Sequence, residues 1–333
     1  LSVTVEYYIT KTNDILYALG LPASSGVGNI TSNIGKTENK GIEISLNGTI
    51  IDNPDGFTWD AGINLYSNQN KITALASGQQ RDEGNLWFVG SPINVIYDYE
   101  YVGLWNESDP DFQYLQQYEP GASAAGMIKV RYTGEYNADG SPVRPIGADD
   151  RVIIDPTPDF QGGFNTRLAY KNIDLSMVGT FQHGGTLVST LYSSSSYLNL
   201  LTGRQNNVAV DYWTPTNTDA RYPAPGGLQS GDNQEYASTL GYFDGSYLKV
   251  RSITLGYNFE QDFITNIGLQ RLRVYASAQN PFVLFSPFHD ESGLDPEITN
   301  SGVDGNGNRQ NSAVNTSNIS RGIPTIGTKP DSS

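Results

Sequence analysis

Two runs of alternating residues decide the fold: Tyr247-Leu-Lys-Val-Arg-Ser-Ile-Thr-Leu-Gly-Tyr257 and, after a short connection, Leu272-Arg-Val-Tyr-Ala-Ser-Ala-Gln279. In the second run every other residue is apolar, and the residues between them are Arg, Tyr, Ser and Gln. A period of two is typical of a strand with one apolar and one wet face. The apolar side chains are too small to fill a large soluble core, and aromatic residues mark the strand ends. The pattern therefore predicts a wall with lipid on one side and water on the other.

The same alternation recurs in segments that begin at Leu1, Ile42, Phe57, Phe164 and Ile173. Each segment runs to about ten residues, which is the length that a tilted strand needs to cross a bilayer. Strands of soluble proteins are usually nearer to about five or six residues. The sequence therefore predicts an all-β fold, an antiparallel transmembrane β-barrel.

Composition excludes several other classes of protein. The chain of 333 residues carries a net charge of -15, so we expect no nucleic-acid partner. It contains no cysteine, which excludes disulfides, thiolate metal sites and thiol nucleophiles. No stretch reaches the roughly 18 consecutive apolar residues of a membrane helix, and a barrel does not need one.

The connections between the predicted strands alternate between short and long. Outer-membrane barrels have short periplasmic turns and longer extracellular loops. We therefore expect the short links on the periplasmic side and the long segments outside. The short links are Asn53–Gly56, Lys171–Asn172 and Glu260–Gln270; the long ones are Lys11–Lys40, His183–Ser246 and Asn280–Ser333.

Strand direction constrains the middle of the chain. The strand from Phe57 leaves a short turn and the strand ending at Tyr170 enters one, so an even number of crossings must lie between them. Ile93–Leu104 and Met127–Tyr136 are the best candidates, which gives nine strands in all. The residues expected to face lipid are Leu46, Ile63, Leu168, Leu175, Val274 and Ala276. Those expected to face the lumen are Asn47, Asn64, Arg167, Ser176 and Arg273.

Several strings occur in a fixed order along the chain. They are Asn33-Ile-Gly-Lys-Thr-Glu-Asn-Lys-Gly-Ile-Glu43, Pro158-Asp-Phe-Gln-Gly-Gly163, Tyr212-Trp213-Thr-Pro215, Asp244-Gly-Ser-Tyr-Leu-Lys-Val-Arg-Ser-Ile-Thr-Leu-Gly-Tyr257 and Asp295-Pro-Glu297. In sequence and order they resemble segments of the SusC/RagA-like TonB-dependent outer-membrane transporters of Bacteroidetes. The resemblance covers nearly the whole chain.

This resemblance implies that residues 1–333 form the C-terminal part of a plugged barrel of about 22 strands. The plug and the first strands would lie outside this chain. The strands at Leu1 and Arg271 would then pair with other polypeptide, because an open edge in lipid leaves backbone groups without partners.

The implied function is TonB-powered import of an oligosaccharide or a peptide across a Gram-negative outer membrane, without chemistry on the substrate. The implied partners are a SusD-like surface lipoprotein, the TonB–ExbB–ExbD complex acting through the plug, and a second such transporter–lipoprotein pair in a dimer. Two other functions stay open from sequence: a secreted lectin-like β-sandwich and a passive porin-like channel.

Metal binding has one candidate segment. Asp304, Asn306 and Asn308 place oxygen ligands at alternate positions, as a calcium loop does, but no bidentate Glu follows at the right place. A plain Gly/Asn-rich loop is the favoured alternative. Where the family carries a D-x-N-x-D-G stretch, this chain has only Tyr136-Asn-Ala-Asp-Gly140 and Asp149-Asp150. We therefore expect no cofactor other than this calcium candidate.

Catalytic motifs are missing from the sequence. His183 and His289 are the only histidines and lie in loop contexts, and no H-E-x-x-H, G-x-S-x-G or P-loop string occurs. The acid pairs Asp149-Asp150 and Asp109/Asp111 are interpreted as solvated loop charges. The distance between two carboxylates in the folded protein defines a glycosidase pair, so the sequence leaves that alternative open. We expect that the protein is not an enzyme.

Aromatic residues outside the clean strands are the best candidates for substrate contact. They are Trp87, Trp105, Tyr212 and Trp213. Aromatic rings offer large rigid surfaces to the apolar faces of sugars and to peptide side chains. Packing between loops and anchoring at the membrane interface are the alternatives, and packing is slightly favoured for Trp213 because Pro215 stiffens its neighbourhood.

Overall fold

The computed structural model describes residues 1–20, 23–53, 56–122, 125–189, 192, 211–224, 238–260, 270, 272–297, 301–303 and 309–314. The chain folds into two compact units. The first contains Leu1–Ile93, Thr157–Thr186 and Asp244–Glu297, and the second contains Asn94–Pro156, Leu187–Phe243 and Ile298–Ser333. Each unit is therefore built from segments that are distant in sequence.

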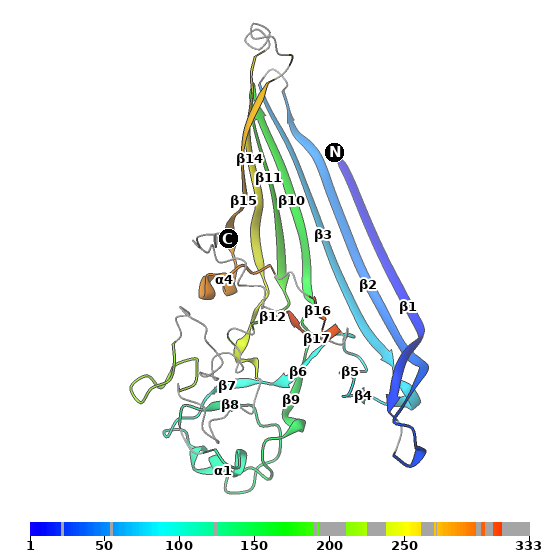
Figure 1. The fold of residues 1–333 in the computed structure, drawn as a ribbon, viewed down its shortest axis with the longest axis vertical. Helices are drawn as coiled ribbons and strands as arrows, with labels where there is room; N and C mark the ends of the chain where they lie inside the picture. Colours follow the sequence, from blue (N-terminus) through cyan, green and yellow to red (C-terminus); the bar gives the residue numbers. More distant parts are fainter. Residues whose placement is uncertain are drawn as a thin grey trace, which may run out of the picture. The chain divides into compact units, whose positions relative to one another are not determined.

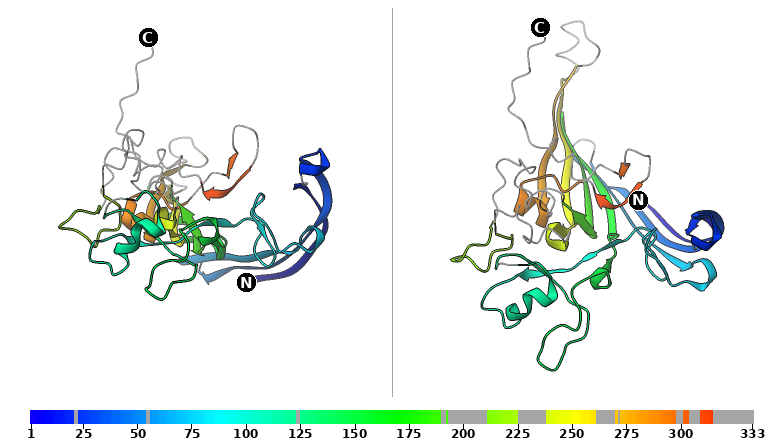
Figure 2. Two further views of the ribbon diagram at one scale, coloured as in Figure 1. Left: turned by 90° about the horizontal axis from the view of Figure 1, so that it is seen from below. Right: turned by 60° about the horizontal axis from the view of Figure 1, so that its bottom comes forward.

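The first unit is built on a seven-stranded antiparallel sheet in the order β1-β2-β3-β10-β11-β14-β15. Its strands lie side by side as one layer (Figure 1), also seen from two further directions in Figure 2. Their bounds are β1 Ser2–Gly20, β2 Asn29–Asp52, β3 Phe57–Ala74, β10 Pro158–Tyr170, β11 Ile173–Gly184, β14 Tyr247–Asn258 and β15 Arg273–Phe285. Within the described ranges, β1 and β15 are the two edges of this sheet and do not pair with each other.

The first hairpin is longer than the sequence pattern predicts. Lys11–Lys40 was expected to be a long loop, but β1 and β2 stay paired from Ser2↔Asn47 to Gly20↔Asn29. The pairing is interrupted only by irregular register between Thr12 and Leu16. The prediction is wrong because the period-two signal is lost here, since Lys11–Asp14 are all polar and Ile15–Leu19 all apolar, whereas backbone hydrogen bonds still hold the strands together.

Between β3 and β10, the described residues contain no further crossings of this sheet. β3 pairs directly with β10, from Phe57↔Tyr170 to Tyr66↔Gln161. The predicted crossings Ile93–Leu104 and Met127–Tyr136 are wrong, since they supply short strands of the second unit: β6 Ile96–Tyr99, β7 Tyr101–Leu104 and β8 Ile128–Val130. Ile96, Leu104, Ile128 and Val130 are buried, as in a soluble core, whereas Val102 is 46% exposed. Zero crossings still satisfies the parity argument, so the sheet has seven strands.

The three predicted short links join neighbouring strands at one end of the sheet. β2 ends at Asp52 and β3 begins at Phe57, and the Gly56 N–H donates to the Asn53 carbonyl at 2.9 Å. β10 and β11 are joined by two residues, of which Lys171 adopts a left-handed conformation with φ 51°. Most of the third link, between β14 and β15, lies outside the described residues.

The second unit has small sheets and a compact aromatic core. β6 pairs with β9 Arg151–Ile154, and β7 pairs with β8. Trp105, Leu115, Tyr118, Ala122 and Met127 form the buried cluster around α1 Leu115–Tyr118. Tyr242 donates a hydrogen bond to the Asp98 carboxylate at 2.7 Å, which ties the two long segments of the unit together.

The remaining elements are short. They are η1 Ala23–Ser25, η2 Ala76–Gly78, β4 Arg81–Asp82, β5 Trp87–Phe88, η3 Phe112–Tyr114, η4 Ala148–Asp150, β12 Thr186–Val188, η5 Thr239–Gly241, β13 Tyr242–Asp244, α4 Pro287–Ser292, β16 Ser301–Val303 and β17 Arg309–Val314. Of the described helices, none is both long and apolar enough to cross a membrane.

A lectin-like sandwich needs two large sheets packed face to face. Apart from the seven-stranded sheet, every sheet in the part of the chain that the structure describes has two strands. The sandwich alternative is therefore wrong.

Candidate functional site

The pairing register gives the large sheet two chemically different faces. Residues directly opposite each other in an antiparallel pair project to the same side. Leu46 lies opposite Ile63, and the row Leu168, Leu175, Leu255 and Ala276 crosses four strands. All the residues predicted to face lipid share this side, which we call the apolar face. Leu46 is 38% exposed and Val274 57% exposed, so the apolar face has no protein cover there.

The opposite side, the polar face, carries the residues predicted to line the lumen. One row of opposite residues crosses β10, β11, β14 and β15 on this face. It consists of Arg167, Ser176, Thr254 and Ser277. Close to the short links, the Arg273 guanidinium lies 2.7 Å from Oδ2 of Asp174. The predicted division of the residues between two faces is confirmed.

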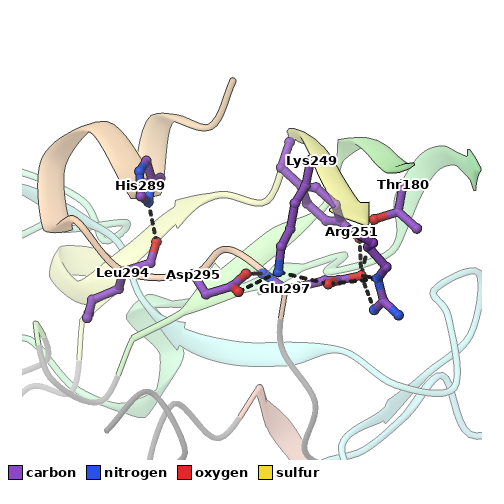
Figure 3. Close-up of polar contacts among 8 residues, drawn as sticks. Thr180, Lys249, Arg251, His289, Leu294, Asp295 and Glu297 are labelled. Carbon is purple, nitrogen blue, oxygen red and sulfur yellow. Dashed lines mark hydrogen bonds and ion pairs between the residues drawn. The ribbon is translucent and has the colours of Figure 1, made fainter. Parts of the chain in front are cut away.

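An ion-pair cluster lies on the polar face of the first unit. Lys249 and Arg251 of β14 meet Asp295 and Glu297, which follow α4 (Figure 3). The Lys249 side chain is 3% exposed and projects from the same face as Thr180 opposite it. Its ammonium bonds Asp295 and lies 3.2 Å from Oε2 of Glu297.

Glu297 is the centre of this cluster. Its carboxylate accepts hydrogen bonds from Nε of Arg251 at 2.9 and 3.1 Å and from Oγ1 of Thr180 at 3.2 Å. The Tyr247 hydroxyl lies at 3.5 Å. Four side chains from β11 and β14 therefore converge on one carboxylate. A buried ammonium such as that of Lys249 is tolerated only with such partners.

The local sequence explains how Glu297 reaches the sheet. Ser286 caps α4 by accepting from the His289 N–H at 3.1 Å, Pro287 fits the first turn, and Gly293 ends the helix at φ 70°. Nδ1 of His289 then contacts the Leu294 carbonyl at 2.7 Å. We call residues 286–297 the strap, because they bring the chain from β15 back over the polar face.

The predicted aromatic candidates differ in their surroundings. Trp105 is 1% exposed in the core of the second unit, and its indole N–H donates to Glu119 at 3.0 Å. Nζ of Lys129 lies 4.3 Å from the centre of the Trp105 ring. This environment matches the packing alternative for Trp105.

Trp213 is half-buried in the same unit. Its indole N–H donates to Oδ1 of Asn106 at 2.7 Å, and its ring lies over Gly126, where an added Cβ would come within 2.6 Å. Tyr212 is 45% exposed, and Trp87 is half-buried on β5 of the first unit. Of the four aromatic candidates, Trp105 and Trp213 both contact the segment 106–127. Trp105 binds Glu119 there, and Trp213 binds Asn106 and covers Gly126.

Of the four acids in the two pairs, Asp109, Asp111 and Asp150 are bonded to basic side chains of the chain itself, and Asp149 is exposed. Asp150 is fully buried and accepts from Arg144 at 2.5 and 3.1 Å and from the N–H groups of Thr133 and Gly147. Burial alone raises the pKa of Asp150, but Arg144 and these N–H donors outweigh it and lower the pKa to about 2. Asp109 and Asp111 both bind Lys129, at 3.3 and 2.9 Å. The interpretation as solvated loop charges is therefore wrong for Asp150 above all, because sequence does not reveal burial.

No group of three or more His, Asp or Glu side chains is arranged to hold a metal ion among the described residues. The calcium candidates Asp304, Asn306 and Asn308 lie outside those residues. In the described part, Asp150 is paired with a guanidinium, and Asp109 and Asp111 are paired with one ammonium.

Comparison with known proteins identifies the family. The family model described as "TonB dependent receptor-like, beta-barrel" matches residues 1–179. The chain belongs to this family. "TonB-dependent receptor P3" of Formosa agariphila is 33% identical over 311 residues, covering 89% of this chain and 29% of the relative. "TonB-dependent receptor SusC" of Bacteroides thetaiotaomicron is 31% identical over 314 residues, covering 91% of this chain and 28% of the relative.

Solved structures agree with the fold. The "closed-closed" state of the RagAB peptide importer matches with a TM-score of 0.63 at 24% identity, covering 85% of this chain and 30% of that one. The RagAB peptide transporter matches with a TM-score of 0.61 over the same shares. The prediction of a SusC/RagA-like TonB-dependent receptor barrel is confirmed. The chain spans less than a third of the length of the curated relatives it matches.

Proposed function

We propose that this TonB-dependent receptor chain forms one part of the wall of an outer-membrane importer for oligosaccharides or peptides. The observation that carries the proposal is the two-faced sheet. Its apolar face is exposed over strands long enough to cross a bilayer, and its polar face carries arginines, asparagines and a buried ion-pair cluster. Such a sheet matches a barrel wall between lipid and a water-filled or plugged lumen.

In this proposal the short links lie in the periplasm, and the β1–β2 connection and the second unit lie outside the cell. Folded loop regions on the outside are where barrels recognise their ligands. The half-exposed Tyr212 and the half-buried Trp87 and Trp213 are the proposed substrate contacts, since aromatic rings bind sugar faces and peptide side chains. No chemistry on the substrate is proposed.

Energy and capture would come from partners. The TonB–ExbB–ExbD complex would act on a plug formed by polypeptide outside this chain, and a SusD-like lipoprotein would cover the extracellular side. The support is membership of the TonB-dependent receptor family, the relative named SusC, and the fold shared with RagAB. A dimer of such pairs is proposed on the same basis.

Uptake by intact cells tests this function. We expect cells carrying the receptor to take up a labelled oligosaccharide or peptide, and uptake to stop when TonB is deleted. Uptake of both substrate classes that depends only on molecular size, faster for smaller molecules, and that is unchanged without TonB would instead show a passive porin-like channel. A screen of growth on single glycans and on defined peptides would then separate the two substrate classes.

A further inference from the structure

The apolar face ends abruptly on the side of the long connections. On β2, alternate residues from Ile50 to Ile42 are apolar or glycine, and the next two on this face are Lys40 and Glu38. About nine strand positions at ~3.4 Å each span roughly 30 Å. At a tilt of about 40° that is roughly 23 Å, close to the ~25 Å apolar band of outer-membrane barrels. Lys40 therefore lies at the edge of the band.

Two more lysines from neighbouring strands lie beside Lys40 on the same face. Lys11 of β1 and Lys71 of β3 are both directly opposite Glu38, one on each side. Their ammonium groups lie 3.6 Å from the Glu38 carboxylate, and that of Lys40 lies 2.8 Å from it. We call these four residues the basic cluster.

The geometry leaves the lysines accessible. The side chains of Lys11, Lys40 and Lys71 are 70%, 45% and 50% exposed, whereas that of Glu38 is 14% exposed. One carboxylate thus holds three ammonium groups together, and two positive charges stay uncompensated within the cluster. This concentration of positive charge stands out in a chain whose net charge is -15.

The neighbours of the basic cluster have the order found at a membrane interface. Tyr7, opposite Ile42 on the apolar face, is 65% exposed and lies next to the cluster on the membrane side. Ile9, opposite Lys40, follows Tyr7 on this face of β1, and Lys11 comes next. An aromatic ring near the end of the apolar band, with lysines just beyond, is typical of the level of lipid head groups. Asp159 is the acidic residue bonded to Ser67 of β3, through its backbone carbonyl at 2.6 Å. Its side-chain carboxylate contacts His183 at 3.2 Å.

We propose that the basic cluster binds the phosphate group of a lipid head group in the leaflet that adjoins the long connections. Lysine ammonium groups bind phosphate as point charges, and a lipid anchored in the bilayer presents its phosphate at this level. Glu38 offsets one of the three lysine charges and leaves two for the phosphate. The inference rests on the proposed placement of the apolar face in lipid, and not on import.

Native mass spectrometry of the receptor in non-ionic detergent tests the proposal. The probes are dioctanoyl phosphatidic acid, zwitterionic dioctanoyl phosphatidylcholine and inorganic phosphate. For the variant Lys11→Gln/Lys40→Gln/Lys71→Gln we expect binding of phosphatidic acid to weaken at least about tenfold, because each lysine near a lipid surface contributes several-fold. Phosphatidylcholine and inorganic phosphate should bind weakly to both proteins.

A matched control removes the same charge elsewhere. The variant Arg81→Gln/Arg131→Gln/Lys171→Asn changes exposed positions outside the cluster and should bind phosphatidic acid like the parent. Glu38→Gln keeps all three lysines, so it should bind at least as tightly as the parent even if the triple lysine variant folds poorly. Heat-modifiable migration on a gel reports folding of every variant.

Equal loss of phosphatidic acid binding in the cluster and control variants would overturn the proposal, as would weaker binding by a folded Glu38→Gln receptor. Inorganic phosphate binding as tightly as phosphatidic acid would overturn the assignment to a lipid. None of these measurements uses uptake, so a failure of the import proposal would leave their outcome unchanged.

Discussion

The buried ammonium of Lys249 lies 3.2 Å from the carboxylate of Glu297. Glu297 follows Lys249 by 48 positions in the sequence, and β15 lies between them. This contact fixes the strap to the polar face. Lys249 and Glu297 belong to two sequence strings that are far apart, and their contact joins the two strings in one structural site. The consequences of this contact can be measured.

Removing Glu297 should destabilise the first unit. We expect Glu297→Gln to cost about 2 kcal/mol, less than the ~3–5 kcal/mol of a buried pair broken outright, because Asp295 still contacts Lys249. The heat-modifiable transition of the receptor should therefore move to lower temperature. Asp290→Asn, an equal charge change at an exposed position of α4, should leave it unchanged. Adding Lys249→Met to Glu297→Gln should recover part of the lost stability. If the destabilising effects of the two single substitutions simply add in the double variant, the buried ion pair is contradicted.

Acid should loosen the second unit through Asp150. The pKa of Asp150 is lowered to about 2, so its ionised form stabilises the fold above pH ~4 and the contribution is lost as pH falls from about 4 toward 2. At neutral pH the contribution is about 2 kcal/mol. Hydrogen exchange at the Thr133 and Gly147 amides should accelerate between pH 6 and pH 3 after correction for intrinsic rates. Asp150→Asn should show fast exchange at both pH values, while Asp149→Asn should behave like the parent.

The two faces of β2 should respond oppositely to arginine. Leu46→Arg puts a charge on the apolar face and should cost about 2–4 kcal/mol in lipid, whereas Ser45→Arg on the polar face should cost little. The folded fraction after refolding into vesicles measures both. If Ser45→Arg abolishes folding and Leu46→Arg does not, the faces have been assigned to the wrong sides.

Cysteine labelling should establish the orientation of the sheet in the outer membrane. The chain contains no cysteine, so single substitutions report cleanly. In intact cells, Ser25→Cys in the β1–β2 connection should react with an impermeant maleimide, and Asn172→Cys in the β10–β11 turn should not. Both should react in permeabilised cells. Labelling of Asn172→Cys alone in intact cells would reverse the orientation.

The sequence predicted the sheet well only where apolar and polar residues alternate with a period of two. The face of Leu46, the turn at Lys171 and the hairpin between β14 and β15 all follow from that period. Beyond the apolar band, β1 and β2 continue as paired strands without an alternating pattern, so Lys11–Lys40 was predicted to be a loop.

The candidate sites were harder to predict, because burial and distant contacts decide them. Nothing in the string around Asp150 reveals that Arg144 binds it, and nothing near Trp105 shows that its ring is enclosed. The strap could have been suspected from complementary charges, since Lys249 and Arg251 in one string match Asp295 and Glu297 in another. Their actual pairing required the fold.

The direct pairing of β3 with β10 has a consequence for how such receptors diversify. The chain leaves the sheet at Ala74 and re-enters the neighbouring strand at Pro158, so about 80 residues are inserted without altering a single register position of the wall. Loop length adds only slowly to the entropic cost of closing a connection. Insertions of very different size and sequence can therefore be exchanged at this position while the paired strands on both sides keep their register.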